Sequence, residues 1–336
     1  MARCEGTEAV IVRTVWMLVV LAGTAFGAGT AKKTVRVGAD GSGQFRTVQE
    51  AVDSAPEGNV VVRIRPGVYR QVLTIKANGV TLRGMGKRPQ DVVLTYDNSA
   101  KMAGGTTKSA STTVSGDDFY AENVTFENSW ERANGTRGEG AQAVALLVNG
   151  DREVFRRVRF LGYQDTLYAN SKTCHGAGET GACRASRQYF TDCYVEGHVD
   201  FIFGDAKAVF ERCEIHAMAH PVVTITAQSR VRPEEDSGYL FRDCVVTAEE
   251  GAKDILLGRP WRAYSTVVWV GTEFKAALDA KGWAEWDGRL ATSDYEEYGS
   301  RGNAGDVTLR VGERAGDAGS YGVREWLGGW DALAVR

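Results

Sequence analysis

The chain has 336 residues, enough for one large domain or two of ordinary size. Its formal net charge is −3 with 25% charged residues, which excludes the bulk basic field that binds nucleic acid. Glycine is frequent at 40 residues and proline is scarce at 6, and this mixture favours many short strands joined by tight turns over long helices.

The N-terminus has the pattern of a secretory signal peptide. Arg3 and Arg13 precede the apolar stretch TVWMLVVLAGTAFGAG, which ends in small residues. We therefore predict a signal peptide over residues 1–27, cleaved after Ala25 or Gly27. The apolar run is too short and too rich in glycine and threonine for a membrane span, so we expect a secreted protein, extracellular or periplasmic, with no membrane attachment. An uncleaved anchor is the alternative.

The stretch FRTVQEAVDSAPEG predicts a short amphipathic helix. Its apolar side chains fall on one helical face, which comprises Phe45, Val48, Ala51, Val52 and Ala55. From about residue 60 the pattern changes to that of strands, in VVVRIRPGVY, VLTIKANGVTLRG and VVLTY. We expect the helix to cap the N-terminal end of the structure that these strands begin, because an open edge strand invites aggregation.

A short motif then recurs along the chain. It reads AENVTF, FRRVRF, FTDCYV, FERCEI and FRDCVV, starting at Ala121, Phe155, Phe190, Phe210 and Phe241. Irregular spacing around a unit of roughly 20–30 residues is typical of a solenoid with loops inserted in some coils. We therefore predict a parallel β-helix. A β-sandwich is the alternative, but its tight hairpins require Asn-Gly turns between matched strands, which we do not find.

Five cysteines follow the predicted signal peptide: Cys174, Cys183, Cys193, Cys213 and Cys244. The first two bracket the glycine-rich loop CHGAGETGAC, and in an exported protein we expect them to form a disulfide. A bridge between Cys193 and Cys213 is the alternative. The cysteines contain no CxxC pair and the four histidines lack zinc-ligand spacing, so we expect no metal.

Polar residues interrupt apolar strands in four segments. These are QAVALLV with Gln142, GYQDTLY with Gln164 and Asp165, GHVDFIFG with Asp200, and LLGRPW with Arg259 and Trp261. A carboxylate inside an apolar run needs a compensating charge, which Arg259 can supply from a neighbouring coil. A carboxylate nucleophile, a second carboxyl as acid and base, and amide donors for an oxyanion are sufficient for acyl transfer.

The same segments resemble the signature motifs of the pectin methylesterases, which remove methyl groups from homogalacturonan. The resemblance extends from VGADGSGQFRTVQEAVDSAPEG through GVYRQ, QAVAL, GYQDTLY, VDFIFG, LGRPW and GWAEW to WLGGW. It implies a right-handed parallel β-helix, a catalytic domain over residues 28–336 and pectin as the substrate. It also implies an enzyme without a cofactor, which we expect to be a monomer and to keep its turnover in the presence of a chelator.

The resemblance also implies roles for individual residues. Asp200 resembles the nucleophile and Asp165 the acid and base, whose pKa should rise beside a negative Asp200. Gln142 and Gln164 resemble the amides that stabilise the oxyanion, and Arg259 resembles the residue that orients Asp200. The expected substrate-binding residues are Thr106, Gln142, Val199, Phe203, Arg259 and Trp261.

Two departures from the family pattern concern the same region. His198 replaces a threonine often found two residues before the nucleophile, and residues 171–187 form an insertion beside the expected cleft. Two other functions remain open at this point. One is a β-helical pectate lyase or polygalacturonase, and the lyase would require calcium bound by an acidic cluster. The other is a non-catalytic β-solenoid that binds carbohydrate.

Overall fold

The computed structural model describes residues 1–2, 32–135, 138–172, 184–302 and 321–335. The predicted signal peptide lies almost wholly outside the described residues, as do Cys174 and Cys183 with their predicted disulfide. The segment from Lys32 to Arg336 forms one compact unit. Among the residues that are described, none belongs to a helix long and apolar enough to span a membrane.

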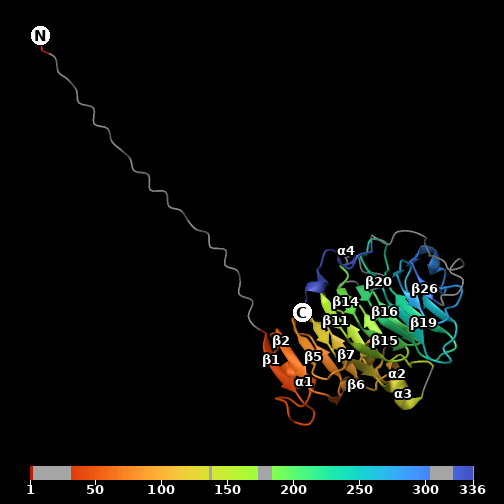
Figure 1. Ribbon diagram of the computed structural model, residues 1–336, viewed down its shortest axis with the longest axis horizontal. Helices are drawn as coiled ribbons and strands as arrows, with labels where there is room; N and C mark the ends of the chain where they lie inside the picture. The colour runs from red at the N-terminus through yellow and green to blue at the C-terminus, as the bar shows by residue number, and fades with distance from the viewer. Residues whose placement is uncertain (3–31, 136–137, 173–183, 303–320, 336) are drawn as a thin grey trace. The chain divides into compact units, whose positions relative to one another are not determined.

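The compact unit is a right-handed parallel β-helix, which confirms the predicted fold (Figure 1). Each complete coil adds one strand to each of three sheets, and every named strand pairing is parallel. Sheet A contains β1 (Lys33–Val37), β2 (Val60–Ile64), β5 (Thr81–Gly84), β8 (Tyr120–Glu122), β11 (Glu153–Arg156), β14 (Arg187–Thr191), β17 (Lys207–Glu211), β20 (Gly238–Arg242), β23 (Thr266–Val270) and β25 (Asp294–Tyr298), paired in that order.

Sheets B and C follow the same succession. Sheet B contains β3 (Gly67–Arg70), β6 (Val92–Tyr96), β9 (Thr125–Asn128), β12 (Arg159–Leu161), β15 (Tyr194–Gly197), β18 (Glu214–Ala217), β21 (Val245–Ala248), β24 (Glu273–Phe274) and β26 (Arg301–Gly302). Sheet C contains β4 (Leu73–Ile75), β7 (Thr112–Val114), β10 (Leu146–Val148), β13 (Leu167–Ala169), β16 (Val199–Gly204), β19 (Val223–Gln228) and β22 (Ile255–Gly258).

The helices are short and lie outside the stack of coils. They are α1 (Val48–Asp53), α2 (Ala100–Ala103), α3 (Trp130–Asn134) and α4 (Val323–Trp326). Single turns of 3₁₀ helix cover Pro89–Asp91 (η1), Thr107–Ser109 (η2), Arg289–Thr292 (η3) and Ala332–Ala334 (η6). In a solenoid, turns and loops lead directly from each strand to the next, so the crossover helices that join strands in other parallel sheets are not required.

The recurring motif aligns coil on coil. In sheet A, Ala121, Phe155, Phe190, Phe210 and Phe241 pair in succession, as the repeat predicted. The phenylalanine rings stack nearly parallel inside the solenoid, with centroids 4.8, 4.6 and 4.6 Å apart. The spacing of paired strands is about 4.8 Å, so identical side chains at equivalent positions come into van der Waals contact. This ladder forms the middle of the core.

The polar residues of the motif make the corner between sheets A and B. Arg157, Asp192, Arg212 and Asp243 each lie two positions after a ladder phenylalanine, and their φ angles are 51, 55, 52 and 52°. Such left-handed conformations are uncommon for residues other than glycine, although aspartate tolerates them. Their recurrence at one coil position means that the corner has the same backbone geometry in successive coils.

The residues that follow this corner in three successive coils are cysteines with free thiols. Cys193, Cys213 and Cys244 are buried and unpaired, so the alternative Cys193–Cys213 disulfide is wrong. Each Sγ lies within hydrogen-bonding distance of a carbonyl oxygen on the preceding coil, at 3.4, 3.5 and 3.3 Å. The side chains therefore point inward in parallel, and each thiol behaves as a small buried apolar group with a weak donor.

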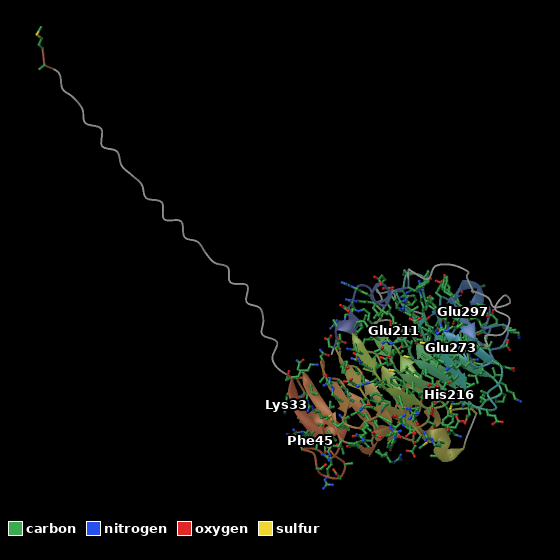
Figure 2. All side chains as sticks on the ribbon, in the orientation of Figure 1. Lys33, Phe45, Glu211, His216, Glu273 and Glu297 are labelled. Carbon is green, nitrogen blue, oxygen red and sulfur yellow. The ribbon has the colours of Figure 1, made fainter. Side chains whose placement is uncertain are left out.

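Helix α1 begins at an N-cap threonine, Thr47, whose side chain and Glu50 form a capping box. Its buried face carries the predicted Val48, Ala51 and Val52. The helix contacts β1, β2 and β4, the first strands of sheets A and C, so it covers the N-terminal end of the core as expected. Phe45 precedes the helix and packs against the same core at this end (Figure 2).

Candidate active site

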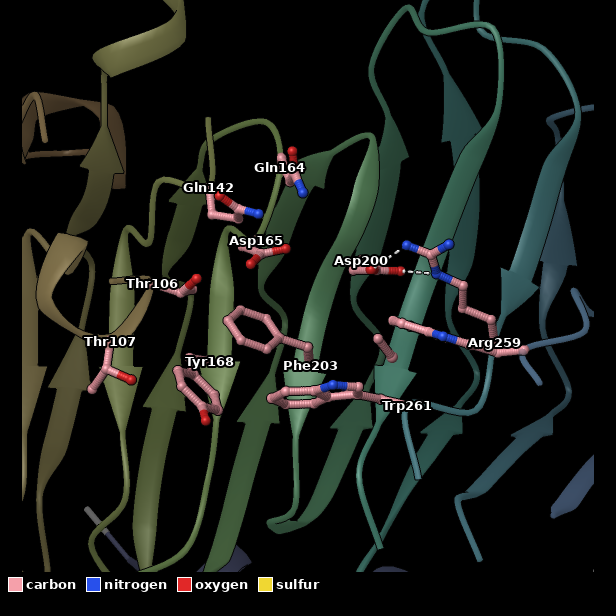
Figure 3. Close-up of a pocket in the computed structure, with 12 residues that line it drawn as sticks. Thr106, Thr107, Gln142, Gln164, Asp165, Tyr168, Asp200, Phe203, Arg259 and Trp261 are labelled. Atoms are coloured by element: carbon pink, nitrogen blue, oxygen red, sulfur yellow. Dashed lines mark hydrogen bonds and ion pairs between the residues drawn. The ribbon is translucent and has the colours of Figure 1, made fainter. Parts of the chain in front are cut away.

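A cavity of about 410 Å³ opens on the outer face of sheet C. Strands β13, β16 and β19 form its floor, segments just before β10 and β13 form its upper edge, and the segment just after β22 lies at one side (Figure 3). Its lining comprises Thr106, Thr107, Gln142, Gln164, Asp165, Tyr168, Asp200, Phe203, Ala227, Arg259, Trp261 and Trp286. Residues that are up to 180 positions apart in sequence thus meet because adjacent coils stack.

A β-bulge places Asp200 in this cavity. Val199 pairs with Thr224 and Ile202 pairs with Thr226, so two residues of β16 oppose one residue of β19. Asp200 takes a φ angle of 51° in the bulge. The extra residue breaks the alternation of inward and outward side chains, so the carboxylate of Asp200 faces the cavity. Phe201 and Ile202, which follow it, remain fully buried in the core. A carboxylate within an apolar run is therefore compatible with an intact core.

Asp165 lies in the turn immediately before β13, and it too has a positive φ angle, 64°. Its backbone N–H donates to the carbonyl of Val199 on the next coil at 3.1 Å. On the preceding coil, the N–H of Ala143 donates to the carbonyl of Gln164 at 3.1 Å. Hydrogen bonds on both sides thus hold a turn whose backbone conformation is costly for a residue other than glycine.

Arg259 pairs with Asp200 in a bidentate geometry. Nε donates to Oδ1 at 2.8 Å and Nη2 donates to Oδ2 at 2.6 Å (Figure 3). The Asp200 side chain is 11% exposed and that of Arg259 is 31% exposed. The guanidinium also lies over the ring of Trp286, 4.3 Å from its centroid. This arrangement fixes the orientation of the carboxylate and supplies the compensating charge that its burial requires.

The two carboxyl groups differ in their electrostatic surroundings. Burial raises the pKa of Asp165 well above its ordinary value, and the charge of Asp200 raises it further, against the opposing charge of Arg259. Burial also raises the pKa of Asp200, but hydrogen bonds from Arg259 and its charge counter that rise. Because Arg259 donates two hydrogen bonds to Asp200, the pKa of Asp200 rises less than that of Asp165. The predicted rise in the pKa of Asp165 is confirmed in direction.

Aromatic rings form the lower wall of the cavity. Tyr168 and Phe203 stack with centroids 4.1 Å apart, and Trp261 lies 6.1 Å from Phe203 (Figure 3). These rings come from β13, β16 and the segment after β22. Flat apolar faces beside a row of polar groups suit a ligand with both apolar faces and polar edges, as sugars have.

Eight of the nine residues predicted for the site line this cavity, including Thr106. The exception is Val199. Its side chain is half-buried and does not line the cavity, although its carbonyl accepts the N–H of Asp165. Within the described residues, no group of histidine, cysteine, aspartate and glutamate side chains is arranged to hold a metal ion.

Sequence reasoning missed four residues of the lining. Tyr168 and Trp286 are the last residues of GYQDTLY and GWAEW, which were noticed as motifs but not assigned to the site. Their aromatic character was the signal that could have identified them. Thr107 and Ala227 carry no comparable signal, because a threonine beside Thr106 and an alanine in a strand are ordinary.

Comparisons with known proteins agree with this geometry. A family model described as pectinesterase matches residues 34–318. Pectinesterase 31 of Arabidopsis thaliana is 40% identical over 269 residues, which are 76% of this chain and 77% of that protein. Pectinesterase 2 of Citrus sinensis is 35% identical over 298 residues, 84% of this chain. This chain spans 54% of the length of the citrus protein.

Solved structures give the same result. A pectin methylesterase from carrot superposes with a TM-score of 0.77 at 30% identity, covering 90% of this chain and 95% of the carrot chain. A pectin methylesterase from Aspergillus niger has a TM-score of 0.74 at 32% identity, with 90% and 97% covered. A further pectin methylesterase, solved in complex with a hexasaccharide, has a TM-score of 0.72 at 28% identity, with 88% and 97% covered.

Proposed function

The chain belongs to the pectinesterase family of carboxylic ester hydrolases, and we propose that it hydrolyses the methyl esters of homogalacturonan through an acyl-enzyme on Asp200. The observation that supports this mechanism is that Arg259 donates two hydrogen bonds to Asp200, whereas the pKa of the buried Asp165 beside it is raised. The ion-paired Asp200 provides an ionised and poorly hydrated nucleophile. Asp165 provides a protonated acid beside it.

Acylation starts with attack of an Asp200 oxygen on the C6 carbonyl carbon of a methylated galacturonate. The carbonyl π electrons move to oxygen, and side-chain amide N–H groups of Gln142 and Gln164 donate to the resulting oxyanion. Collapse of this intermediate breaks the bond to the methoxy oxygen. Asp165 gives that oxygen its proton, methanol departs, and an anhydride joins Asp200 to the sugar.

Deacylation reverses the role of Asp165, which is now a carboxylate and takes a proton from water. The hydroxide formed in this way attacks the sugar's C6 carbonyl, and the same amides stabilise the second oxyanion. Cleavage of the anhydride returns Asp200 as a carboxylate paired with Arg259 and releases a free galacturonate. Asp165 holds the proton again, so the cycle closes with one ester and one water consumed.

The other pectin-active chemistries fit this geometry less well. A lyase would need a cation held by acidic groups, whereas Arg259 already neutralises Asp200 in a bidentate pair. A non-catalytic carbohydrate-binding solenoid would use Trp261 and the other rings but has no use for a buried, ion-paired carboxylate beside a second, protonated one. The proposal also includes secretion, a monomeric state and turnover without a cofactor.

The decisive experiment measures two products from methylated pectin at once. Methanol release reports ester hydrolysis, and the length distribution of the uronide chains reports backbone cleavage. We expect methanol with no shortening of the chains. Shortened chains without methanol would replace the esterase with a lyase or glycosidase, and pectin binding without either product would indicate a carbohydrate-binding protein.

A further inference from the structure

A buried histidine–glutamate pair lies beside the two aspartates and takes no part in the steps above. His198 is 3% exposed and Glu131 is 5% exposed. The imidazole Nε2 lies 3.2 and 3.1 Å from the two carboxylate oxygens of Glu131. His198 immediately precedes β16 and stands two positions before Asp200, whereas Glu131 belongs to α3. Neither residue lines the cavity, so any effect on the reaction must pass through the structure around them.

The backbone at position 198 joins the segments that carry both aspartates. The N–H of His198 donates to the carbonyl of Tyr163 at 2.9 Å. The carbonyl of Val199, the residue after His198, accepts the N–H of Asp165 at 3.1 Å. These two bonds tie the turn that holds Asp165 to the bulge that holds Asp200. Both aspartates have positive φ angles, which persist only where the surrounding structure enforces them. A contact that fixes residue 198 therefore helps to fix the positions of both Asp165 and Asp200.

The ring environment selects one tautomer of His198. Its Nδ1 is buried and has no hydrogen-bond partner among the residues that the structure describes, and the ring of His220 stacks on the imidazole with centroids 4.5 Å apart. A proton on Nδ1 would be a buried donor without an acceptor, which is costly. A proton on Nε2 instead points at the carboxylate of Glu131. The neutral ring thus carries its proton on Nε2.

We propose that Glu131 and His198 form a positioning pair, in which the Glu131 carboxylate holds the Nε2–H tautomer of His198 and anchors residues 198–199 against α3. Through those residues the pair sets the position of Asp165 relative to Asp200. This proposal rests on the proposed function of the two aspartates. Because the pair touches no substrate, its loss lowers kcat and leaves KM for pectin nearly unchanged.

The test compares His198→Ala, Glu131→Ala and Glu131→Gln by methanol release. We expect each alanine variant to lose kcat on the order of 10-fold to 100-fold, because a small misplacement of reacting groups is sufficient for such a loss. The amide oxygen of Glu131→Gln still accepts from Nε2–H, so this variant should recover kcat to within about threefold of wild type. The double alanine variant should be no slower than the slower single variant, because the two residues act as one unit.

The matched control is His216→Ala. His216 lies in β18 and bonds Thr247 through Nδ1 at 2.7 Å, on sheet B rather than at the cavity (Figure 2). We expect its kcat to stay within twofold of wild type. Melting temperatures recorded for all variants separate a loss of folded protein from a slower folded enzyme, because only the latter supports the proposal.

A measurement without substrate keeps this proposal distinct from the proposed function. The ¹⁵N spectrum of wild-type imidazoles should show the Nε2–H tautomer for His198, identified by its loss in His198→Ala. An Nδ1–H tautomer, folded alanine variants with wild-type kcat, or a Glu131→Gln variant as slow as Glu131→Ala would each overturn the positioning pair. A wild-type protein that releases no methanol would instead overturn the proposed function.

Discussion

Asp165 and Asp200 are the same amino acid in two environments, and the difference between them lies in their partners. Both are buried, both have a left-handed backbone, and both have raised pKa values. Arg259 donates two hydrogen bonds to Asp200 and none to Asp165 among the described contacts. A single guanidinium therefore makes the pKa rise of Asp200 smaller than that of Asp165.

The first prediction concerns the acid role of Asp165. Asp165→Asn has no proton to give to departing methoxide, so acylation by methyl esters should slow by about 10²–10⁴-fold. Aryl esters with good leaving groups need no acid and should be acylated at a rate within about tenfold of wild type. Pre-steady-state acylation rates with the two ester classes measure the difference. Equal losses on both would show that Asp165 is not the acid.

The second prediction concerns the planar guanidinium of Arg259. Arg259→Lys keeps the positive charge but provides neither two parallel donors for Asp200 nor a planar group to stack on Trp286. We expect kcat to fall on the order of 100-fold, equivalent to about 3 kcal/mol. Steady-state methanol release checks this, with the exposed Arg88→Lys as the control. A lysine variant that retains wild-type kcat would mean that charge alone is sufficient.

At the scale of the elements, the ladder of aromatic rings holds the coils together. Phe190 is fully buried and stacks between Phe155 and Phe210, with centroids 4.8 and 4.6 Å away. Truncation of a phenylalanine in such a place removes apolar burial and leaves a cavity that rigid strands cannot close.

The third prediction follows from this ladder. Phe190→Ala should lower the free energy of unfolding by about 3–5 kcal/mol. The exposed Val222→Ala should change it by less than about 0.5 kcal/mol, as surface substitutions usually do. Denaturant titration of both variants gives the two values. A loss near that of the control would mean that the ladder position tolerates a void and that the stacked rings contribute little.

The repeat and the cap could be predicted from sequence because both depend on local patterns. Phenylalanine recurred at equivalent positions, and the apolar face of α1 followed helical spacing. The bulge at Asp200 could not be predicted. A run of consecutive apolar residues has the same sequence pattern whether or not the strand contains a register shift. The contact between His198 and Glu131 was also hidden, since it joins residues 67 positions apart that share no motif.

The site itself was predictable for a different reason. Gln142, Asp165, Asp200 and Arg259 are polar residues within or beside apolar stretches of the sequence, and such exceptions stand out whatever the fold. Val199 was assigned to the cleft, together with Phe203, from the resemblance to the pectin methylesterases. The bulge at Asp200 breaks the alternation there, and Val199 contributes its backbone carbonyl rather than its side chain.

At the scale of the whole molecule, the C-terminal segment covers the outer face of sheet A. Val323 of α4, Leu327 and Ala332 of η6 pack against an apolar stripe on that face. The stripe comprises Tyr120, Val154, Tyr189, Val209, Leu240, Val268 and Val270. The outer face of sheet A is thus covered along this stripe, from β8 to β23, as parallel sheets normally are, whereas Thr34 and Arg36 of β1 are exposed.

The fourth prediction concerns the pH dependence of global stability. Burial raises the pKa of Asp205 to about 7, although hydrogen bonds from Ser171 oppose the rise. The unfolded carboxyl titrates near 4, so the native state binds the proton more tightly. This contribution to stability is complete below pH 4 and is lost as the pH rises through about 7.

Asp205→Asn removes that titration. Between pH 4 and 8 the variant should therefore gain stability relative to wild type, by up to about 1.4 kcal/mol per unit of pKa difference. Urea unfolding at several pH values measures this, with the exposed Asp254→Asn as the control. A difference between Asp205→Asn and wild type that does not change with pH would mean that Asp205 is already ionised in the native protein near pH 4.

The most direct test of the mechanism is Asp200→Ala with methylated pectin as the substrate. Removal of the nucleophile should reduce methanol release to less than about a hundredth of the wild-type kcat, a loss of more than about 3 kcal/mol, while binding of pectin against Trp261 largely persists. If the variant binds pectin and keeps more than about a hundredth of the wild-type kcat, Asp200 is not the nucleophile and the acyl-enzyme mechanism is wrong.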